Sequence, residues 1–90
     1  MTAKKKRLQD LRNVGKATLG DLHRLGITTV EKLARQDAAH LYEELQRVTG
    51  QRHDPCVWDV FAAIIHEAQT GEPTNWWAWT PQRKQQAKRK

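Results

Sequence analysis

Glycines that follow regularly spaced apolar residues divide this chain into short helical segments, and these helix ends limit its fold more than any other feature. Leucine recurs every three residues from Leu19 to Leu25, directly before Gly26. A glycine just past the last periodic residue commonly ends a helix, because it adopts the left-handed conformation at low cost. Gly50 and Gly71 close two later segments in the same way. The sequence therefore predicts an all-α fold.

Residues that cap the first turn of a helix mark where three of these segments begin. Thr28, with Glu31 three residues later, forms a capping box. Asp37 precedes the segment "AAHLYEELQRVT", and Asp54 followed by Pro55 combines an N-cap with proline at the first helical position. Two further helices are expected: a short one that begins in the lysine run, and the leucine-rich segment that ends before Gly26. The predicted total is therefore five helices, which leaves no room for a sheet.

The length of 90 residues and the apolar fraction of 38% limit the chain to one small domain, because so short a chain cannot support two independent cores. The single cysteine excludes an internal disulfide, so we expect a reducing, cytoplasmic location. The longest apolar run, "WDVFAAII", is too short to span a membrane, and no apolar segment follows the charged N-terminus. We therefore expect neither a membrane-spanning segment nor a cleavable signal.

Positive charge is concentrated at the two ends of the chain. The formal net charge is +6, yet the body over residues 8–80 is net −3 because its seven basic side chains are outnumbered by ten acidic ones. Within the body, residues 8–36 are net +2 and residues 37–80 are net −5. A partner that carries phosphates would therefore meet the two ends and the first third of the domain.

This charge pattern divides the chain into a basic N-terminal arm over residues 1–7, a helical domain over 8–80 with a tryptophan-rich end, and a basic, disordered tail over 81–90. Basic arms raise the affinity for any polyanion without adding specificity. Short basic tails can also be merely solubilising, and this alternative stays open. The accessory basic residues of the arms are Lys4, Lys5, Lys6, Arg7, Arg83 and Lys84.

The residues "NVGK" at 13–16 form a short turn between two helical segments, so the two helices must cross. Asn13 and Gly15 are of the residue types that adopt positive φ at low cost, and Val14 between them can pack into the crossing. The amides that open the second helix lack intrahelical acceptors and point outward with the positive end of the helix dipole, an arrangement that binds phosphate. The same turn also fits a purely structural helical hairpin. The predicted DNA-binding residues are Arg12, Asn13, Val14, Gly15, Lys16, Ala17 and Thr18.

The stretch "LRNVGKATLGDLHRLGITTVEKL" resembles the helix-hairpin-helix motif. Continuing through "LYEELQRVTGQRHDPCVWDVFAAIIHEA" to "WWAWT", residues 8–80 resemble a bacterial family of small proteins named after a pathogenicity locus. That family is sometimes labelled mitomycin-resistance-like and is related to the C-terminal domain of the competence regulator TfoX. The resemblance implies a five-helix, SAM-like fold and sequence-independent DNA binding through hairpin amides. Asn13 stands where the motif has its first glycine, and it adds a side chain where a phosphate is expected to approach.

No combination of residues in the chain predicts catalysis. His53 and Cys56 have the spacing of a metal-binding pair, but no second pair completes a four-ligand site. Cys56 shares a helical face with Val60 and Ile64, so we expect a packed and unreactive thiol. Paired carboxylates, a glycine-rich phosphate loop and a Ser-His-Asp set cannot be nominated. We therefore expect no enzymatic activity, metal, cofactor or small-molecule substrate.

The tryptophan-rich segment "WWAW" at residues 76–79 can fold back on the last predicted helix. Trp58, Ala62 and Ile65 form a second apolar stripe on that helix, which something must cover. We expect the three indoles of the segment to cover it, because a small domain is short of apolar area. Two alternatives stay open: one or more indoles stack on unpaired bases, or the stripe and the indoles meet across a homodimer.

Together these features predict a domain that binds DNA without sequence preference. The alternative is a SAM-like module for protein–protein interaction or homodimerisation, for which the acidic residues within 37–80 offer a surface to a basic partner.

Overall fold

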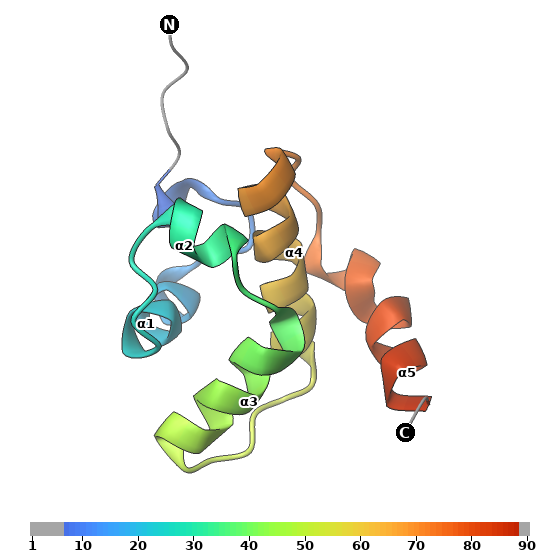
Figure 1. Ribbon diagram of the computed structural model, residues 1–90. Coiled ribbons are helices and arrows are strands. Elements are labelled where there is room, and N and C mark those ends of the chain that lie inside the picture. The colour runs from blue at the N-terminus through green and yellow to red at the C-terminus, as the bar shows by residue number, and fades with distance from the viewer. Residues whose placement is uncertain (1–6, 89–90) are drawn as a thin grey trace, which may run out of the picture.

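The computed structural model describes residues 7–88, and this part of the chain is helical without a single strand. Helix α4 runs through the middle of the molecule, with α3 crossing on one side and α5 on the other (Figure 1). The predicted all-α class is confirmed, and residues 7–88 contain five α-helices, the number predicted. In chain order the elements are the 3-10 helix η1 (Leu8–Asp10), α1 (Lys16–Arg24), α2 (Val30–Ala34), α3 (Ala38–Thr49), α4 (Cys56–Thr70), the 3-10 helix η2 (Trp76–Trp79) and α5 (Thr80–Lys88).

The five α-helices are not the five that the sequence predicts. Helices α1 to α4 match the second to fifth predicted segments. The first predicted helix is represented only by the short 3-10 helix η1, and the lysine run before it lies outside the described residues. The fifth helix is α5, which occupies most of the segment predicted to be a disordered tail. That prediction is wrong for residues 81–88.

The helix boundaries follow the predicted caps with two shifts. At the start of α4, Pro55 is the N-cap and Cys56 the first helical residue, one position later than predicted, although Asp54 Oδ1 still accepts from the Cys56 amide at 2.8 Å. The Asp37 carboxylate accepts a hydrogen bond from the His40 amide at 3.0 Å, and Gly50 ends α3 with a φ of 66°. The capping box predicted at Thr28 is wrong, because Thr29 is the N-cap and its hydroxyl accepts from the Lys32 amide at 3.1 Å. Two adjacent threonines offer the same local chemistry, so packing makes the choice between them.

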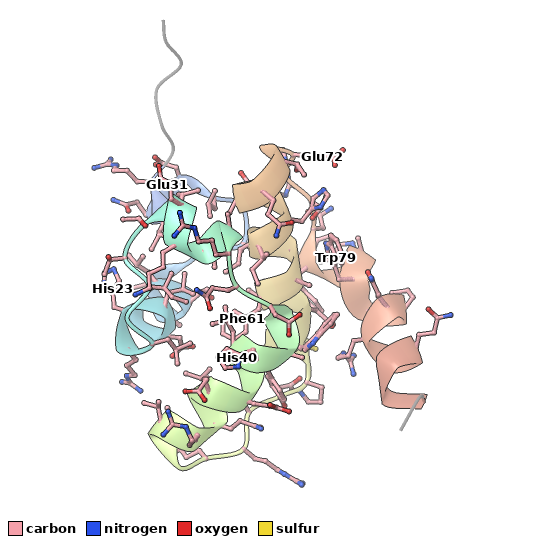
Figure 2. All side chains as sticks on the ribbon, viewed as in Figure 1. His23, Glu31, His40, Phe61, Glu72 and Trp79 are labelled. Carbon is pink, nitrogen blue, oxygen red and sulfur yellow. The ribbon has the colours of Figure 1, made fainter. Side chains whose placement is uncertain are left out.

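Helix α4 forms the centre of the core. Its residues Phe61 and Ile64 are buried against leucines from the other helices, and Phe61 lies in the middle of the side chains in Figure 2. The stripe of Trp58, Ala62 and Ile65 is also buried, and η2 packs mainly on α4. The prediction that the tryptophan-rich segment returns to this helix is confirmed.

A buried carboxylate attaches α5 to the body of the molecule. Asp59 on α4 is fully buried, and its Oδ1 accepts a hydrogen bond from Arg83 Nε at 2.9 Å. Its Oδ2 accepts from the Thr80 hydroxyl at 2.7 Å. An ionised carboxylate is buried at low cost only when it is paired and hydrogen-bonded, so these two residues of α5 must stay in place. This requirement explains why the segment is ordered and why Arg83, 23% exposed, is a structural partner rather than a free cation of an arm.

Candidate nucleic-acid interface

The turn between η1 and α1 reverses the chain at Asn13. The φ of Asn13, 75°, is the only positive φ at a non-glycine residue in the described part of the chain. Gly15 has a φ of −94° and a ψ of −173°, the extended conformation of an ordinary N-cap. The prediction of positive φ is therefore confirmed at Asn13 and wrong at Gly15, because the reversal is complete before the helix begins. Val14 between them is half-buried against the core, as its predicted packing role requires.

The start of α1 presents backbone amides that have no acceptor in the described part of the chain. Gly15 is the N-cap and offers no side chain to accept from them, and the first backbone hydrogen bond into the helix runs from Leu19 N to Gly15 O at 2.9 Å. The amides of residues 16–18 donate no hydrogen bond to any acceptor within residues 7–88. Gly15, Lys16 and Ala17 are exposed and Thr18 is half-buried. These amides can therefore bind an anion at the positive end of the α1 dipole.

Three hydrogen bonds hold the turn to the end of α4 and to the segment that follows it. Asn13 Nδ2 donates to the carbonyl of Thr74 at 2.6 Å, and Arg12 Nε donates to Asn75 Oδ1 at 2.8 Å. The Arg12 amide donates to Oε1 of the buried Glu67, also at 2.8 Å. The Asn13 side chain is thus turned towards residue 74, and the guanidinium of Arg12 is anchored at its Nε rather than mobile. Sequence reasoning missed these contacts because they join residues more than fifty positions apart.

The three indoles of η2 have different environments. Trp79 is half-buried against the core, where its Nε1 donates to the Thr74 hydroxyl at 2.9 Å and its ring lies 5.2 Å from that of His66. Trp77 is 58% exposed, and the half-buried Trp76 meets its ring edge-on at 5.6 Å and 83°. The predicted role in the core is confirmed for Trp79 and wrong for Trp77. A 3-10 helix has three residues per turn, so positions 76 and 79 align while position 77 points elsewhere.

A shallow groove joins the turn to the two adjacent tryptophans of η2, and we call it the hairpin–tryptophan groove. It combines apolar walls with amide and hydroxyl groups, and none of its lining residues is acidic. Four of the seven predicted DNA-binding residues therefore share one surface with an exposed indole. The lining residues are Asn13, Val14, Gly15, Thr18, Val60, Asn75, Trp76 and Trp77.

The accessory basic residues of the two arms do not act as one group. Arg7 is exposed, with its Nε 3.8 Å from Asp10 Oδ2, and Lys84 on α5 is exposed. Arg83 is committed to Asp59, so its charge is largely neutralised by an internal partner. Lys4, Lys5 and Lys6 lie outside the described residues.

Most acidic residues of the net −5 half have partners within the chain. Asp37 and Asp54 accept from backbone amides at the starts of α3 and α4. Arg47 donates to Glu44 at 2.6 Å, and His66 Nε2 lies 2.8 Å from Glu72 Oε1. Asp59 and Glu67 are buried, as described above. The acidic surface that the sequence offers to a basic partner is therefore smaller than the formal charge suggests.

The candidate metal and nucleophile positions are engaged in structural contacts. Among residues 7–88, no group of three or more potential ligands of the His, Cys, Asp or Glu type comes together. His53 Nε2 lies 2.9 Å from the Thr49 hydroxyl, while His23 and His40 lie on different helices (Figure 2). Hydrogen bonding to Asp54, together with partial burial, raises the pKa of the half-buried Cys56 thiol. None of the helices within residues 7–88 is long and apolar enough to cross a membrane.

Replacing Gly15 with alanine should leave the stability of the fold nearly unchanged. A Cβ at this position meets no atom within 4 Å, and the backbone is extended. Alanine is a poorer N-cap than glycine, but it also lowers the entropy of the unfolded chain, so the two effects oppose each other. We expect a change within about 0.5 kcal/mol in the free energy of unfolding, measured by urea denaturation.

Gly50→Ala is the control and should cost about 1–2 kcal/mol, because position 50 requires positive φ. A larger loss for Gly15→Ala than for Gly50→Ala would contradict this description of the turn.

Comparison with known proteins identifies the family of the chain. The family model described as pathogenicity locus, Cdd1, matches residues 1–85. A mitomycin resistance protein, McrB, from Streptomyces lavendulae is 36% identical over 77 residues, which cover 86% of this chain and 73% of the relative. No solved structure matches the chain significantly. The resemblance seen in the sequence is thus confirmed at the level of the family, and the chain belongs to the pathogenicity-locus family.

Proposed function

We propose that this chain is a non-enzymatic domain that binds DNA without sequence preference, and that residues 11–33 act as a helix-hairpin-helix motif in a SAM-like fold. The observation that carries the proposal is the start of α1, where the amides of residues 16–18 have no acceptor within the described chain. Backbone amides contact phosphate oxygens irrespective of the base, so a site of this kind positions DNA without reading its sequence.

Two basic residues support this assignment of the hairpin. Arg12 and Lys16 are exposed on either side of the turn. Anchoring of Arg12 Nε by Asn75 leaves the terminal amino groups of the guanidinium for a phosphate. Lys16 opens α1 and adds a mobile charge beside the amides. The side chain of Asn13, which could obstruct a phosphate, is held by Thr74 instead.

The alternative function is protein–protein interaction or homodimerisation. Its support from charge is weak, because the acidic groups of residues 37–80 mostly cap helices or form internal pairs. Trp77 is one exposed indole, whereas a stable interface buries about 800 Å² on each partner. DNA binding is therefore the function that the geometry supports best.

The dependence of DNA binding on salt tests the proposed function. We expect the full chain to bind short duplexes of unrelated sequence with equal affinity, and the affinity to fall between about 50 and 200 mM salt. Each phosphate contact should contribute about −0.9 to the slope of log affinity against log salt. Two hairpin contacts and the arms predict a slope of about −2 or steeper, measured by fluorescence anisotropy with labelled duplexes. Absence of binding at the lowest salt, or strong preference for one sequence, would contradict the proposal.

A further inference from the structure

We propose that the hairpin–tryptophan groove holds an unpaired nucleobase, so that the domain binds DNA with a single-stranded end more tightly than continuous duplex. The inference rests on the proposed DNA-binding function and specifies the form of DNA that the site takes. The observations that support this inference are the hairpin–tryptophan groove and the exposed side chain of Trp77, not the start of α1.

Trp77 offers a preformed surface for stacking. It is 58% exposed, whereas Trp58 is buried and Trp79 is packed against the core. Trp76 meets the Trp77 ring nearly perpendicularly, at 83°, and therefore limits how that ring can turn. A ring held in place loses little conformational freedom when a base stacks on it. Base stacking on aromatic side chains is tolerant of sequence, which agrees with a domain that does not read bases.

The walls of the groove supply polar groups that a base edge can use. Asn13 and Asn75 both line it, and each uses only one end of its side-chain amide in the contacts already described. For Asn13 Oδ1, Asn75 Nδ2 and the Thr18 hydroxyl, the described chain provides no hydrogen-bond partner. These three residues provide both donors and acceptors, which suits the mixed edge of a nucleobase and is more than an apolar ligand needs.

The charges around the groove favour a nucleotide over a peptide. No carboxylate lines the groove, and the exposed cations Arg12 and Lys16 directly flank the lining residues 13–15 along the chain. A nucleotide carries a base between two phosphates, so an indole with cations beside it matches both parts. A protein partner would need apolar area beyond the single indole of Trp77. The occupant that fits is therefore an unpaired base of a DNA strand.

The test compares three duplexes with the full chain. The first is blunt, the second has a short single-stranded overhang, and the third has the same overhang with abasic residues in place of nucleotides. The abasic overhang keeps the phosphates and removes the bases. We expect the normal overhang to bind at least about fivefold more tightly than the abasic one, the lower limit for stacking of one base, and the abasic overhang to bind much like the blunt duplex.

Variants of Trp77 test whether the preference for normal over abasic overhangs arises in the groove. Trp77→Ala should abolish the difference between normal and abasic overhangs and leave affinity for the blunt duplex within about twofold, while Trp77→Phe should retain most of it. Val48→Ala is the matched control, because Val48 is also exposed but does not line the groove. Thermal unfolding of each variant establishes that it is folded.

Four other outcomes would each contradict a different claim about this site. Absence of binding to all three duplexes overturns the proposed function itself. Equal affinity for normal and abasic overhangs, with blunt duplex still bound, overturns only the inference about unpaired bases. A base preference that survives Trp77→Ala places the bases elsewhere on the molecule. A change of oligomeric state in Trp77→Ala without a change in DNA affinity makes Trp77 a contact between proteins.

Discussion

Replacing Arg83 with alanine is expected to destabilise the fold by about 3 kcal/mol, a large part of the stability of a small domain. The substitution leaves the fully buried Asp59 carboxylate with the Thr80 hydroxyl as its remaining partner from α5. Removing one member of a buried ion pair is costly because the other charge stays buried without compensation. The free energy of unfolding, measured by urea denaturation, shows the loss, and far-UV circular dichroism shows whether α5 remains helical.

Two controls separate this effect from a general loss of charge or helicity. Lys84→Ala removes the neighbouring, exposed cation of α5 and should change stability by less than about 0.5 kcal/mol. Adding Asp59→Asn to Arg83→Ala removes the unpaired charge and should recover part of the lost stability. If Arg83→Ala and Lys84→Ala are equally stable, the Asp59–Arg83 pair does not hold α5 in place.

Helices α1 to α4 could be predicted from the sequence because local signals determine their limits. Asp37 and Gly50 lie at the two ends of α3 and act through hydrogen bonds and backbone conformation that involve only near neighbours. Positive φ at Asn13 is a local preference of the same kind. The failure at Thr28 is also local, since Thr29 offers an identical hydroxyl one residue later.

The order of α5 could not be predicted from its own residues. Its sequence, TPQRKQQAK, lacks an apolar face, and a free segment of this composition reads as a basic tail. The cause lies in Asp59, which is 24 residues before Arg83. One signal was available, because Asp59 stands inside the apolar run "WDVFAAII", where a carboxylate requires a partner. The sequence does not say which of the many cations supplies it.

The candidate site can be predicted only in part from the sequence. Turn chemistry predicts the hairpin residues 12–18, but the contact of Asn13 with Thr74 spans 61 positions and leaves no local signal. The exposure of Trp77 follows from the 3-10 geometry of η2, in which adjacent tryptophans cannot face the same helix. The groove between hairpin and indoles therefore emerges only from the tertiary structure.

Charge reversal at Lys16 distinguishes a hairpin that binds DNA from one that serves only as a joint. Lys16 is the first residue of α1 and is exposed. Lys16→Glu removes a cation and places a carboxylate beside amides that would otherwise meet a phosphate. A negative side chain at a helix start favours the helix dipole, so the variant should be at least as stable as the natural protein. A loss of affinity therefore cannot be attributed to unfolding.

The decisive measurement is the affinity of Lys16→Glu and Lys84→Glu for one blunt DNA duplex, by fluorescence anisotropy at about 0.1 M salt. Both variants change the net charge equally, and both lysines are exposed, but Lys84 lies on α5. If the hairpin binds phosphate, Lys16→Glu should weaken binding about tenfold or more and Lys84→Glu by no more than about threefold. If Lys16→Glu binds the duplex as well as Lys84→Glu does, the hairpin is a structural joint and the proposed function is wrong.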